Sequence, residues 1–343
     1  RLDDPQPAGI GDGRRQLGPG DVAHGRLHDR MFDSQQLCYP GAHACHAIQM
    51  TQNDAPVIIE AALNGVTSRE RNANVPATVE EQAKDALACV EAGATVVHTH
   101  APNIVVPPDE AAEQYATAFR PVVEQHPGIV CYPTTGIGAT IEARYGHVEL
   151  LDDMGLVRAG FVDTGSVNLG GTGKDGLPPN SSFVYTNTFA DIAYKMDVCR
   201  TRGLGPSIAI FEPGFLRVVR AYYDAGALPA GTLVKFYFSE GGYLGGGQPL
   251  WGAPPIIEAL DLYLAMLGDA DIPWAVAVLG GSLLATPIAR AALERGGHLR
   301  IGLEDWDAGP TNLEQTAAAA DLCRSVGRSV ATVDDTADAL GLP

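Results

Sequence analysis

The sequence predicts an α/β protein built as a single (β/α)8 TIM barrel. From Val57 to Val326, short apolar runs and amphipathic, helix-like runs alternate eight times, which indicates a parallel sheet covered by helices. An open doubly wound sheet is the alternative. However, the first strand leads into residues 64–67 (NGVT) and not into a Gly-x-Gly-x-x-Gly turn, so a dinucleotide-binding sheet does not fit.

The predicted strands are short runs rich in β-branched and other apolar residues. In chain order they are residues 57–63, 94–99, 129–133, 159–163, 207–211, 233–238, 274–278 and 299–303. The predicted helices are residues 79–91, 109–125, 142–154, 188–202, 215–225, 255–267, 283–294 and 313–326. The first helix follows Thr78, with Glu81 three residues later, which is the pattern of a capping box.

The first 49 residues do not share this pattern. They are rich in Gly, Arg, His, Asp and Pro and have no helical or strand periodicity. We expect residues 1–49 to be a disordered or non-native extension and residues 50–343 to be the catalytic barrel. Our hypothesis is that Met50 is the natural start; a flexible arm that contacts a neighbouring subunit is the alternative, and amino-terminal sequencing decides between them.

Composition limits the possible partners of the chain. Of its 343 residues, 45% are hydrophobic and 19% charged, as in a globular protein, and the net charge of −18 argues against binding to nucleic acid or to an anionic membrane surface. No apolar run approaches the roughly 20 residues that span a bilayer, and no signal-peptide pattern opens the chain. The six cysteines form no Cys-x-x-Cys pair, so we interpret them as reduced thiols of a cytoplasmic protein.

In barrels of this type the chemistry lies where strands end and their βα loops begin. Many polar residues fall at those positions in this chain. They are Asn64, Thr67, His98, His100, Thr134, Thr135, Gly136, Asp163, Ser166, Asn168, Glu212, Ser239, Glu240, Arg300, Glu304 and Asp305.

His98 lies near the end of the second predicted strand, and His100 follows that strand directly. Side chains alternate along a strand, so both imidazoles point to the same side, about 6–7 Å apart, where they can bind one divalent metal. A hydrogen-bonded pair of histidines at a strand end is the alternative. The other histidines after Met50 (126, 147 and 298) lie in helices or at the wrong ends of strands.

The third metal ligand must therefore be a carboxylate. Two histidines, one carboxylate and an open position are typical of a catalytic zinc site. Glu304, Glu212, Asp163 and Glu240 are the candidates.

The last strand carries a charged pattern of its own. Arg300, Gly302 and Glu304 share one face, which in a barrel strand is the inward one. A buried arginine requires an anion, and Glu304 lies within reach of it. A structural salt bridge that lines the barrel is the alternative to a role in the site.

These motifs together resemble the β-keto acid cleavage enzyme family. The resemblance runs from Val57 to the end of the chain and is carried by residues 60–65 (EAALNG), 81–84 (EQAK), 91–94 (EAGA), 98–100 (HTH) and 296–305 (GGHLRIGLED). It implies a (β/α)8 barrel that binds Zn²⁺ and converts a β-keto acid plus acetyl-CoA into acetoacetate and a new CoA thioester. It also implies a homo-oligomer, commonly a tetramer.

The resemblance further assigns residue roles. It implies that His98, His100 and Glu304 bind the zinc, that Asp305 and Arg300 form a catalytic charged pair, and that Thr134 lies beside the substrate. The substrate-binding residues that we expect around them are Asn64, Thr67, Thr135, Gly136, Ser166, Glu212 and Glu240.

The chain also departs from the family pattern. Thr67 stands where a glutamate holds a substrate ammonium in the first characterised type, and Glu212 alone remains where many relatives have paired glutamates in the fifth strand. Residues 281–282 (GS) replace a rim arginine, Trp306 replaces an asparagine, and Ser239-Glu240 replaces small apolar residues. We therefore expect a conserved metal core with a rebuilt specificity pocket. The alternatives are a metal-dependent retro-aldol lyase or hydrolase that does not use CoA, and a catalytically silent zinc-binding barrel.

Overall fold

The structure, a computed structural model, describes residues 54–242 and 247–342. The predictions made for residues 1–49 lie outside this part of the chain. Within the described residues no helix is long and apolar enough to cross a membrane.

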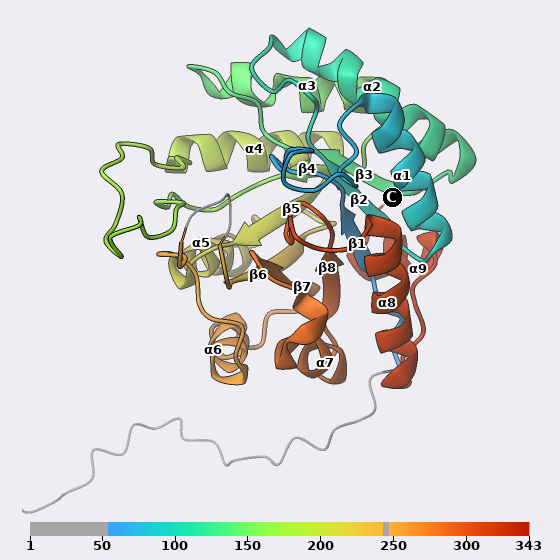
Figure 1. The fold of residues 1–343 in the computed structure, drawn as a ribbon. Helices are drawn as coiled ribbons and strands as arrows, with labels where there is room; N and C mark the ends of the chain where they lie inside the picture. The colour runs from blue at the N-terminus through green and yellow to red at the C-terminus, as the bar shows by residue number, and fades with distance from the viewer. Residues whose placement is uncertain (1–53, 243–246, 343) are drawn as a thin grey trace, which may run out of the picture. The chain divides into compact units, whose positions relative to one another are not determined.

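Eight parallel strands form the barrel that the sequence predicts (Figure 1). They are β1 (Ile59–Ala62), β2 (Val96–Thr99), β3 (Val130–Pro133), β4 (Ala159–Phe161), β5 (Gly205–Ile210), β6 (Leu233–Ser239), β7 (Trp274–Leu279) and β8 (His298–Ile301). The hydrogen-bonded order is β3-β2-β1-β8-β7-β6-β5-β4. The Arg158 N–H donates to the Cys131 carbonyl at 3.3 Å, which joins the start of β4 to β3 and nearly closes the ring.

Helices follow the strands and surround them (Figure 1). They are α1 (Val79–Glu91), α2 (Pro108–Gln125), α3 (Ile141–Asp153), α4 (Phe189–Arg202), α5 (Pro213–Asp224), α6 (Ile257–Leu267), α7 (Pro287–Glu294), α8 (Asn312–Ser325) and α9 (Val333–Leu340). The predicted capping box of α1 is confirmed, because Thr78 and Glu81 bond each other's backbone N–H groups.

Two helix predictions need correction. The predicted helix 283–294 is broken into a 3-10 turn, Leu283–Ala285, and α7, because Pro287 begins a new helix and cannot continue the preceding one. Helix α9 was not predicted. Its Leu340 packs with inward-facing strand residues such as Val96 and Val130 and closes the amino-terminal end of the barrel.

The interior of the barrel follows the two-residue period of its strands. Near the amino-terminal ends the inward side chains are apolar: Ile58, Val96, Val130, Ala159, Leu233 and Ala275 form one cluster. Two residues further along several strands, charged and hydroxyl-bearing side chains replace them, and beyond these lies the polar rim. The barrel thus places its ionisable groups directly below the open carboxyl-terminal face.

Strand β8 is shorter than predicted. It ends at Ile301, and Glu304 lies in a turn and not on the inward face of a strand. The reason is Gly302, which has φ +142°, and where a Cβ would come within 2.0 Å of the Ala62 carbonyl oxygen. The chain therefore turns away immediately after β8, and this turn carries Glu304 over the end of β1.

Candidate metal and active site

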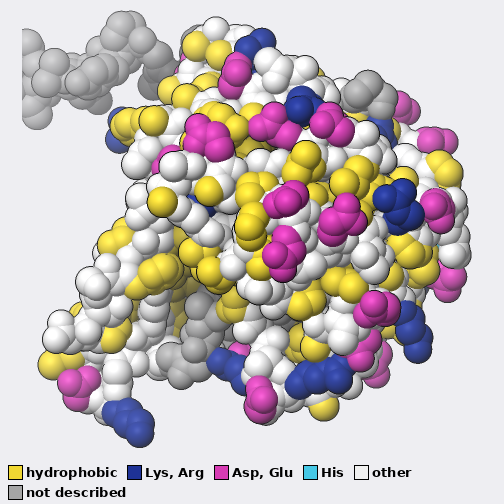
Figure 2. All heavy atoms as spheres, turned by 90° about the horizontal axis from the view of Figure 1, so that it is seen from above, with side chains coloured by type: hydrophobic (Ala, Val, Ile, Leu, Met, Phe, Trp, Pro, Cys, Tyr) yellow, Lys and Arg dark blue, Asp and Glu magenta, His cyan; other side chains and the backbone are white. Residues whose placement is uncertain are grey.

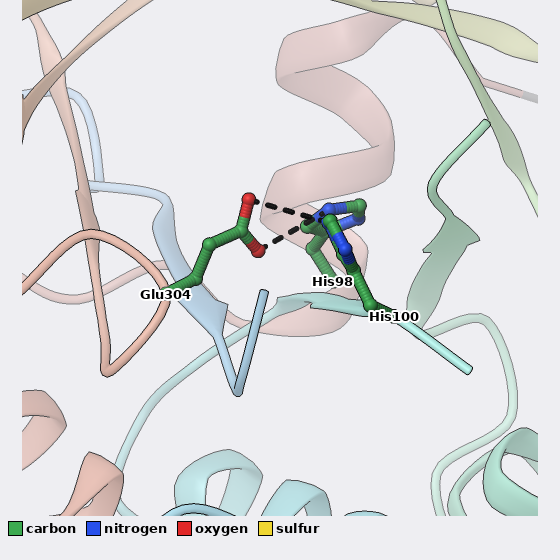
Figure 3. A group of neighbouring side chains, drawn as sticks. All are labelled: His98, His100 and Glu304. Carbon is green, nitrogen blue, oxygen red and sulfur yellow. Dashed lines mark ion pairs between the residues drawn. The ribbon is translucent and has the colours of Figure 1, made fainter. Parts of the chain in front are cut away.

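The structure brings His98, His100 and Glu304 together at the carboxyl-terminal face of the barrel (Figure 3). His98 is in β2, His100 follows it, and Glu304 comes from the turn after β8. The Nε2 atom of His98 lies 3.3 Å from Glu304 Oε2, and the Nε2 atom of His100 lies 3.5 Å from Glu304 Oε1. Within the described residues, no other group of three His, Cys, Asp or Glu side chains could hold a metal ion.

The orientation of His98 is fixed from behind. Its Nδ1 lies 3.1 Å from the Tyr132 carbonyl oxygen, and because a carbonyl can only accept, Nδ1 carries the proton and Nε2 keeps a free lone pair. Its ring stacks on Tyr132 at 4.4 Å and faces Phe161 at 6.1 Å between centroids. Burial lowers the pKa of His98 to about 3, so the imidazole is neutral at physiological pH.

Asn64 holds the backbone that carries the second histidine. Its Oδ1 accepts hydrogen bonds from the His100 N–H and the Thr99 hydroxyl, and its Nδ2 donates to the His100 carbonyl, each at 2.9 Å. Gln82 of α1 donates to the same carbonyl at 3.0 Å. The side chain that we expected to bind substrate therefore fixes the position of a candidate metal ligand.

Glu304 is ionised and held in place by its neighbours. Its Oε1 lies 2.8 Å from Arg300 Nη2. Burial raises the pKa of the carboxyl, but the Arg300 guanidinium beside it opposes burial, and the pKa lies well below its usual range. Gly65 makes room for the side chain, because a Cβ at that position would lie 2.5 Å from Glu304 Cγ.

The three side chains fit a divalent cation. Their ligand atoms all lie within 4.8 Å of one another. The Glu304 Oε2 atom is buried and has no hydrogen-bond partner among the described residues, although the His98 Nε2 lone pair faces it. Two acceptors facing each other without a proton are unfavourable, and a cation between them relieves the repulsion. Two imidazole nitrogens and one carboxylate oxygen are a donor set suited to zinc.

A buried charged network below the triad escaped the sequence analysis. Glu60 of β1 accepts hydrogen bonds from Tyr132 and Arg300 and lies 3.2 Å from Lys235 Nζ, which also donates to Ser207 at 2.7 Å. Burial raises the pKa of Glu60, but Lys235 and Arg300 reverse this and lower it to about 2. A charged residue at an inward-facing position of an otherwise apolar strand was the available signal.

Arg300 links this network to Asp305. Its Nε lies 3.1 Å from Asp305 Oδ2, and its Nη2 lies 3.1 Å from Asp305 Oδ1. Burial raises the pKa of Asp305 to about 6, while Arg300 opposes the rise. The predicted pairing of Arg300 with a carboxylate is confirmed, and the arginine contacts three of them: Glu60, Glu304 and Asp305.

A cavity of about 420 Å³ opens beside the triad and is lined by His100 and Glu304. Thr134, Thr135 and Gly136, which we predicted to lie near the substrate, also line it. Most of its wall is apolar and aromatic, and Figure 2 shows hydrophobic side chains gathered around a hollow on one face of the barrel. The apolar lining residues include Phe161, Leu169, Phe183, Phe211, Tyr237 and Leu279.

A second cavity, of about 340 Å³, adjoins the first. It is lined by Asn64 and Thr67, and it shares Val66, His100 and Ile104 with the larger cavity. Thr67 itself donates to the Leu303 carbonyl at 3.0 Å, which ties the β1–α1 loop to the turn that carries Glu304.

Three predicted substrate residues do not line either cavity. Ser166 donates to the Asn187 carbonyl at 3.0 Å, and Glu212 accepts from the Gly252 N–H at 2.9 Å, so both hold loops in place. Glu240 is exposed at the end of β6. Of the four carboxylates considered as the third metal ligand, Glu304 alone joins the histidines within the described chain.

Known proteins resemble the chain over almost all of the part that the structure describes. A family described as beta-keto acid cleavage enzyme matches residues 56–342. A 3-oxoadipate:acetyl-CoA acetyltransferase of Cupriavidus necator is 31% identical, over 86% of this chain and 96% of the relative. A 3-keto-5-aminohexanoate cleavage enzyme of Fusobacterium nucleatum is 27% identical, over 83% of this chain and 98% of the relative.

Solved structures add a likeness of fold. ObcA in complex with oxaloacetate superposes with a TM-score of 0.57 at 15% identity, over 78% of this chain and 67% of ObcA. At this identity the likeness supports the barrel architecture alone.

Proposed function

The chain belongs to the β-keto acid cleavage enzyme family, and from this premise we propose that it exchanges acyl groups between a β-keto acid and acetyl-CoA. The bond between C2 and C3 of the keto acid breaks, and the CH2–COO⁻ unit forms a new carbon–carbon bond to the acetyl carbonyl carbon. The products are acetoacetate and a CoA thioester of the remaining acyl group. The observation that carries the proposal is the convergence of His98, His100 and Glu304 beside the larger cavity.

Zinc is the cofactor that we propose for this triad. When bound, it supplies a Lewis acid that polarises the keto oxygen. The protein contributes the orientation: the Tyr132 carbonyl sets the tautomer of His98, Asn64 fixes the backbone of His100, and Arg300 positions Glu304.

We assign proton transfer to Asp305. A carboxyl with a pKa near 6 is largely ionised at neutral pH and still basic enough to accept a proton from carbon next to a ketone. Arg300 holds both of its oxygens and restrains the carboxylate. The Thr134 side chain, which lines the cavity, is the donor that we propose for the substrate carboxylate.

Two adjoining cavities support a reaction with two substrates. The larger one accommodates the side chain of a β-keto acid, and the smaller one leaves room for the thioester arm to approach from the other side of His100. The family resemblance leads us to propose a homo-oligomer, and the spacing of the cysteines leads us to propose a cytoplasmic location.

Incubation of the zinc-loaded protein with acetyl-CoA and a panel of β-keto acids tests the proposal. We expect acetoacetate to form only when both substrates are present. Cleavage without acetyl-CoA would instead indicate a lyase or hydrolase, and zinc binding without turnover of any acid would indicate a catalytically silent barrel.

A further inference from the structure

The mouth of the larger cavity is built from exposed apolar side chains of three different loops. Val66 comes from the loop after β1, Ile137 from the loop after β3, and Phe183 from the loop before α4. They are 55%, 58% and 62% exposed, so a ligand that enters the cavity can reach each of them. Exposed apolar side chains that gather around one cavity indicate a ligand-binding site.

The apolar surface continues into the interior of the cavity. Phe211, Tyr237 and Leu279 line it from the ends of β5, β6 and β7, and the rings of Phe211 and Tyr237 lie 4.9 Å apart between centroids. A hydrocarbon group would therefore be removed from water along the whole length of the cavity, which is favourable in proportion to the apolar area buried.

The wall offers no free positive charge to a second carboxylate on the substrate. Arg144 is the only lysine or arginine among the described lining residues. Its guanidinium already contacts Asp191 at 2.9 Å and the Thr186 carbonyl at 3.3 Å. A substrate carboxylate would have to compete with Asp191, and transfer of an unpaired carboxylate into an apolar cavity is costly.

The aromatic rings are not arranged to receive a substrate cation either. A cation binds an aromatic ring over its face, but two of these faces already have a protein cation. Lys195 Nζ lies 5.6 Å from the centroid of Phe161, and the Arg300 guanidinium lies 5.5 Å from that of Tyr237. The carboxylate of Asp163 is fully buried and is bound by the Tyr185 hydroxyl at 2.6 Å, so it presents no accessible negative charge.

We propose that the larger cavity selects β-keto acids whose side chain is an uncharged hydrocarbon. This inference rests on the proposed function of the same site. The selection has two parts: the apolar wall favours the hydrocarbon, and the engaged charges of Arg144, Lys195 and Arg300 leave no partner for an anionic or a cationic side chain.

The first test compares two pairs of acids that match in shape and differ in charge. One pair is 5,5-dimethyl-3-oxohexanoate and its trimethylammonium analogue, 3-oxo-4-(trimethylammonio)butanoate. The other is 6-methyl-3-oxoheptanoate and 3-oxoadipate, in which a carboxylate replaces the isopropyl group. Binding to zinc-loaded protein is measured by calorimetry without acetyl-CoA, and kcat/KM is measured with it. In each pair we expect the hydrocarbon acid to bind at least about tenfold more tightly.

The second test varies the length of the side chain. From 3-oxopentanoate to 3-oxooctanoate we expect the affinity of the wild type to rise roughly two- to fourfold for each added methylene group. Phe183→Ala removes apolar surface at the mouth and should reduce the total gain by at least about threefold. Phe189→Ala is the matched control, because this ring is 77% exposed but lines a different groove, between α4 and α5, and should leave the gain unchanged. Thermal unfolding of both variants establishes that they are folded.

Equal or tighter binding of the charged member of either pair would overturn the inference, and so would an unchanged gain with chain length in a folded Phe183→Ala protein. The predicted order of affinities without acetoacetate formation would support the inference and reject the proposed reaction instead.

Discussion

Glu304 is the residue at which the charges of the site meet. One of its oxygens faces Arg300, and the other faces the unprotonated Nε2 of His98. Because burial keeps His98 neutral, no proton lies between its Nε2 lone pair and Glu304 Oε2. Arg300 contacts the other oxygen of Glu304 and does not relieve this repulsion. The arrangement is therefore better satisfied by a bound cation than by the protein on its own.

Removal of either kind of ligand is expected to abolish metal binding. His98→Ala and Glu304→Gln should each weaken zinc binding by more than the roughly 10–100-fold that loss of a supporting group costs. Zinc per chain, measured by elemental analysis after gel filtration, checks this. A Glu304→Gln protein that retained a full complement of zinc would show that the third ligand is a different residue.

Asp305→Asn is the matched control for the metal and a prediction in its own right. It keeps the shape of the side chain next to Glu304 but cannot accept a proton, so we expect normal zinc content and a roughly 10²–10⁴-fold loss of kcat. Wild-type turnover with full zinc content would remove Asp305 from the mechanism.

Lys195 makes stability depend on pH. Burial lowers its pKa from 10.5 to about 8, so between these values the unfolded chain binds more protons than the folded protein. The stability of the wild type relative to Lys195→Met should therefore rise with pH from about 8 to 10, by up to about 3 kcal/mol. Urea unfolding of both proteins across this range measures the difference, and a difference that did not change with pH would contradict the assignment.

Among the structural elements, the turn after β8 has the most direct link to the site. Gly302 passes so close to the Ala62 carbonyl that any Cβ would clash, and Glu304 follows two residues later. Gly302→Ala should therefore cost clearly more than the roughly 1 kcal/mol of a left-handed glycine alone, and should also weaken zinc binding.

Gly155→Ala is the control for that substitution. Gly155 also has a positive φ, +69°, but a Cβ there would have no heavy atom within 4 Å. We expect a loss of about 1 kcal/mol in urea unfolding and unchanged zinc content. Equal losses in the two variants would show that close packing at Gly302 is not important.

The sequence predicted the elements whose signals are local. Alternation along β2 was enough to place His98 and His100 on one side, and a buried Arg300 was enough to require a carboxylate. The end of β8 was missed, because only the approach of Gly302 to β1 reveals where the strand stops. Helix α9 was missed because its role, to close the barrel, exists only in three dimensions.

At the scale of the molecule, the barrel brings together residues that are far apart in the chain. Glu60 and Arg300 are 240 positions apart and are paired in the register of β1 and β8. The residue pattern left four carboxylates open as the third ligand and only the family resemblance implied Glu304, which barrel closure places beside the histidines.

Removal of residues 1–49 is expected to leave the catalytic protein intact. The family match begins at residue 56, and residues 50–343 form a unit of their own. A protein that starts at Met50 should unfold within about 2 °C of the full chain and retain its kcat and its oligomeric state, measured by calorimetry and light scattering. Loss of oligomers on truncation would instead support an arm that contacts a neighbouring subunit.

The most direct measurement of the central claim follows carbon atoms. Zinc-loaded enzyme is given a β-keto acid and acetyl-CoA with ¹³C at the carbonyl carbon. The account predicts that the label appears at C3 of acetoacetate, that one new acyl-CoA forms for each acetoacetate, and that His98→Ala produces neither. Consumption of the keto acid while the label stays in acetyl-CoA or is released as acetate would contradict it.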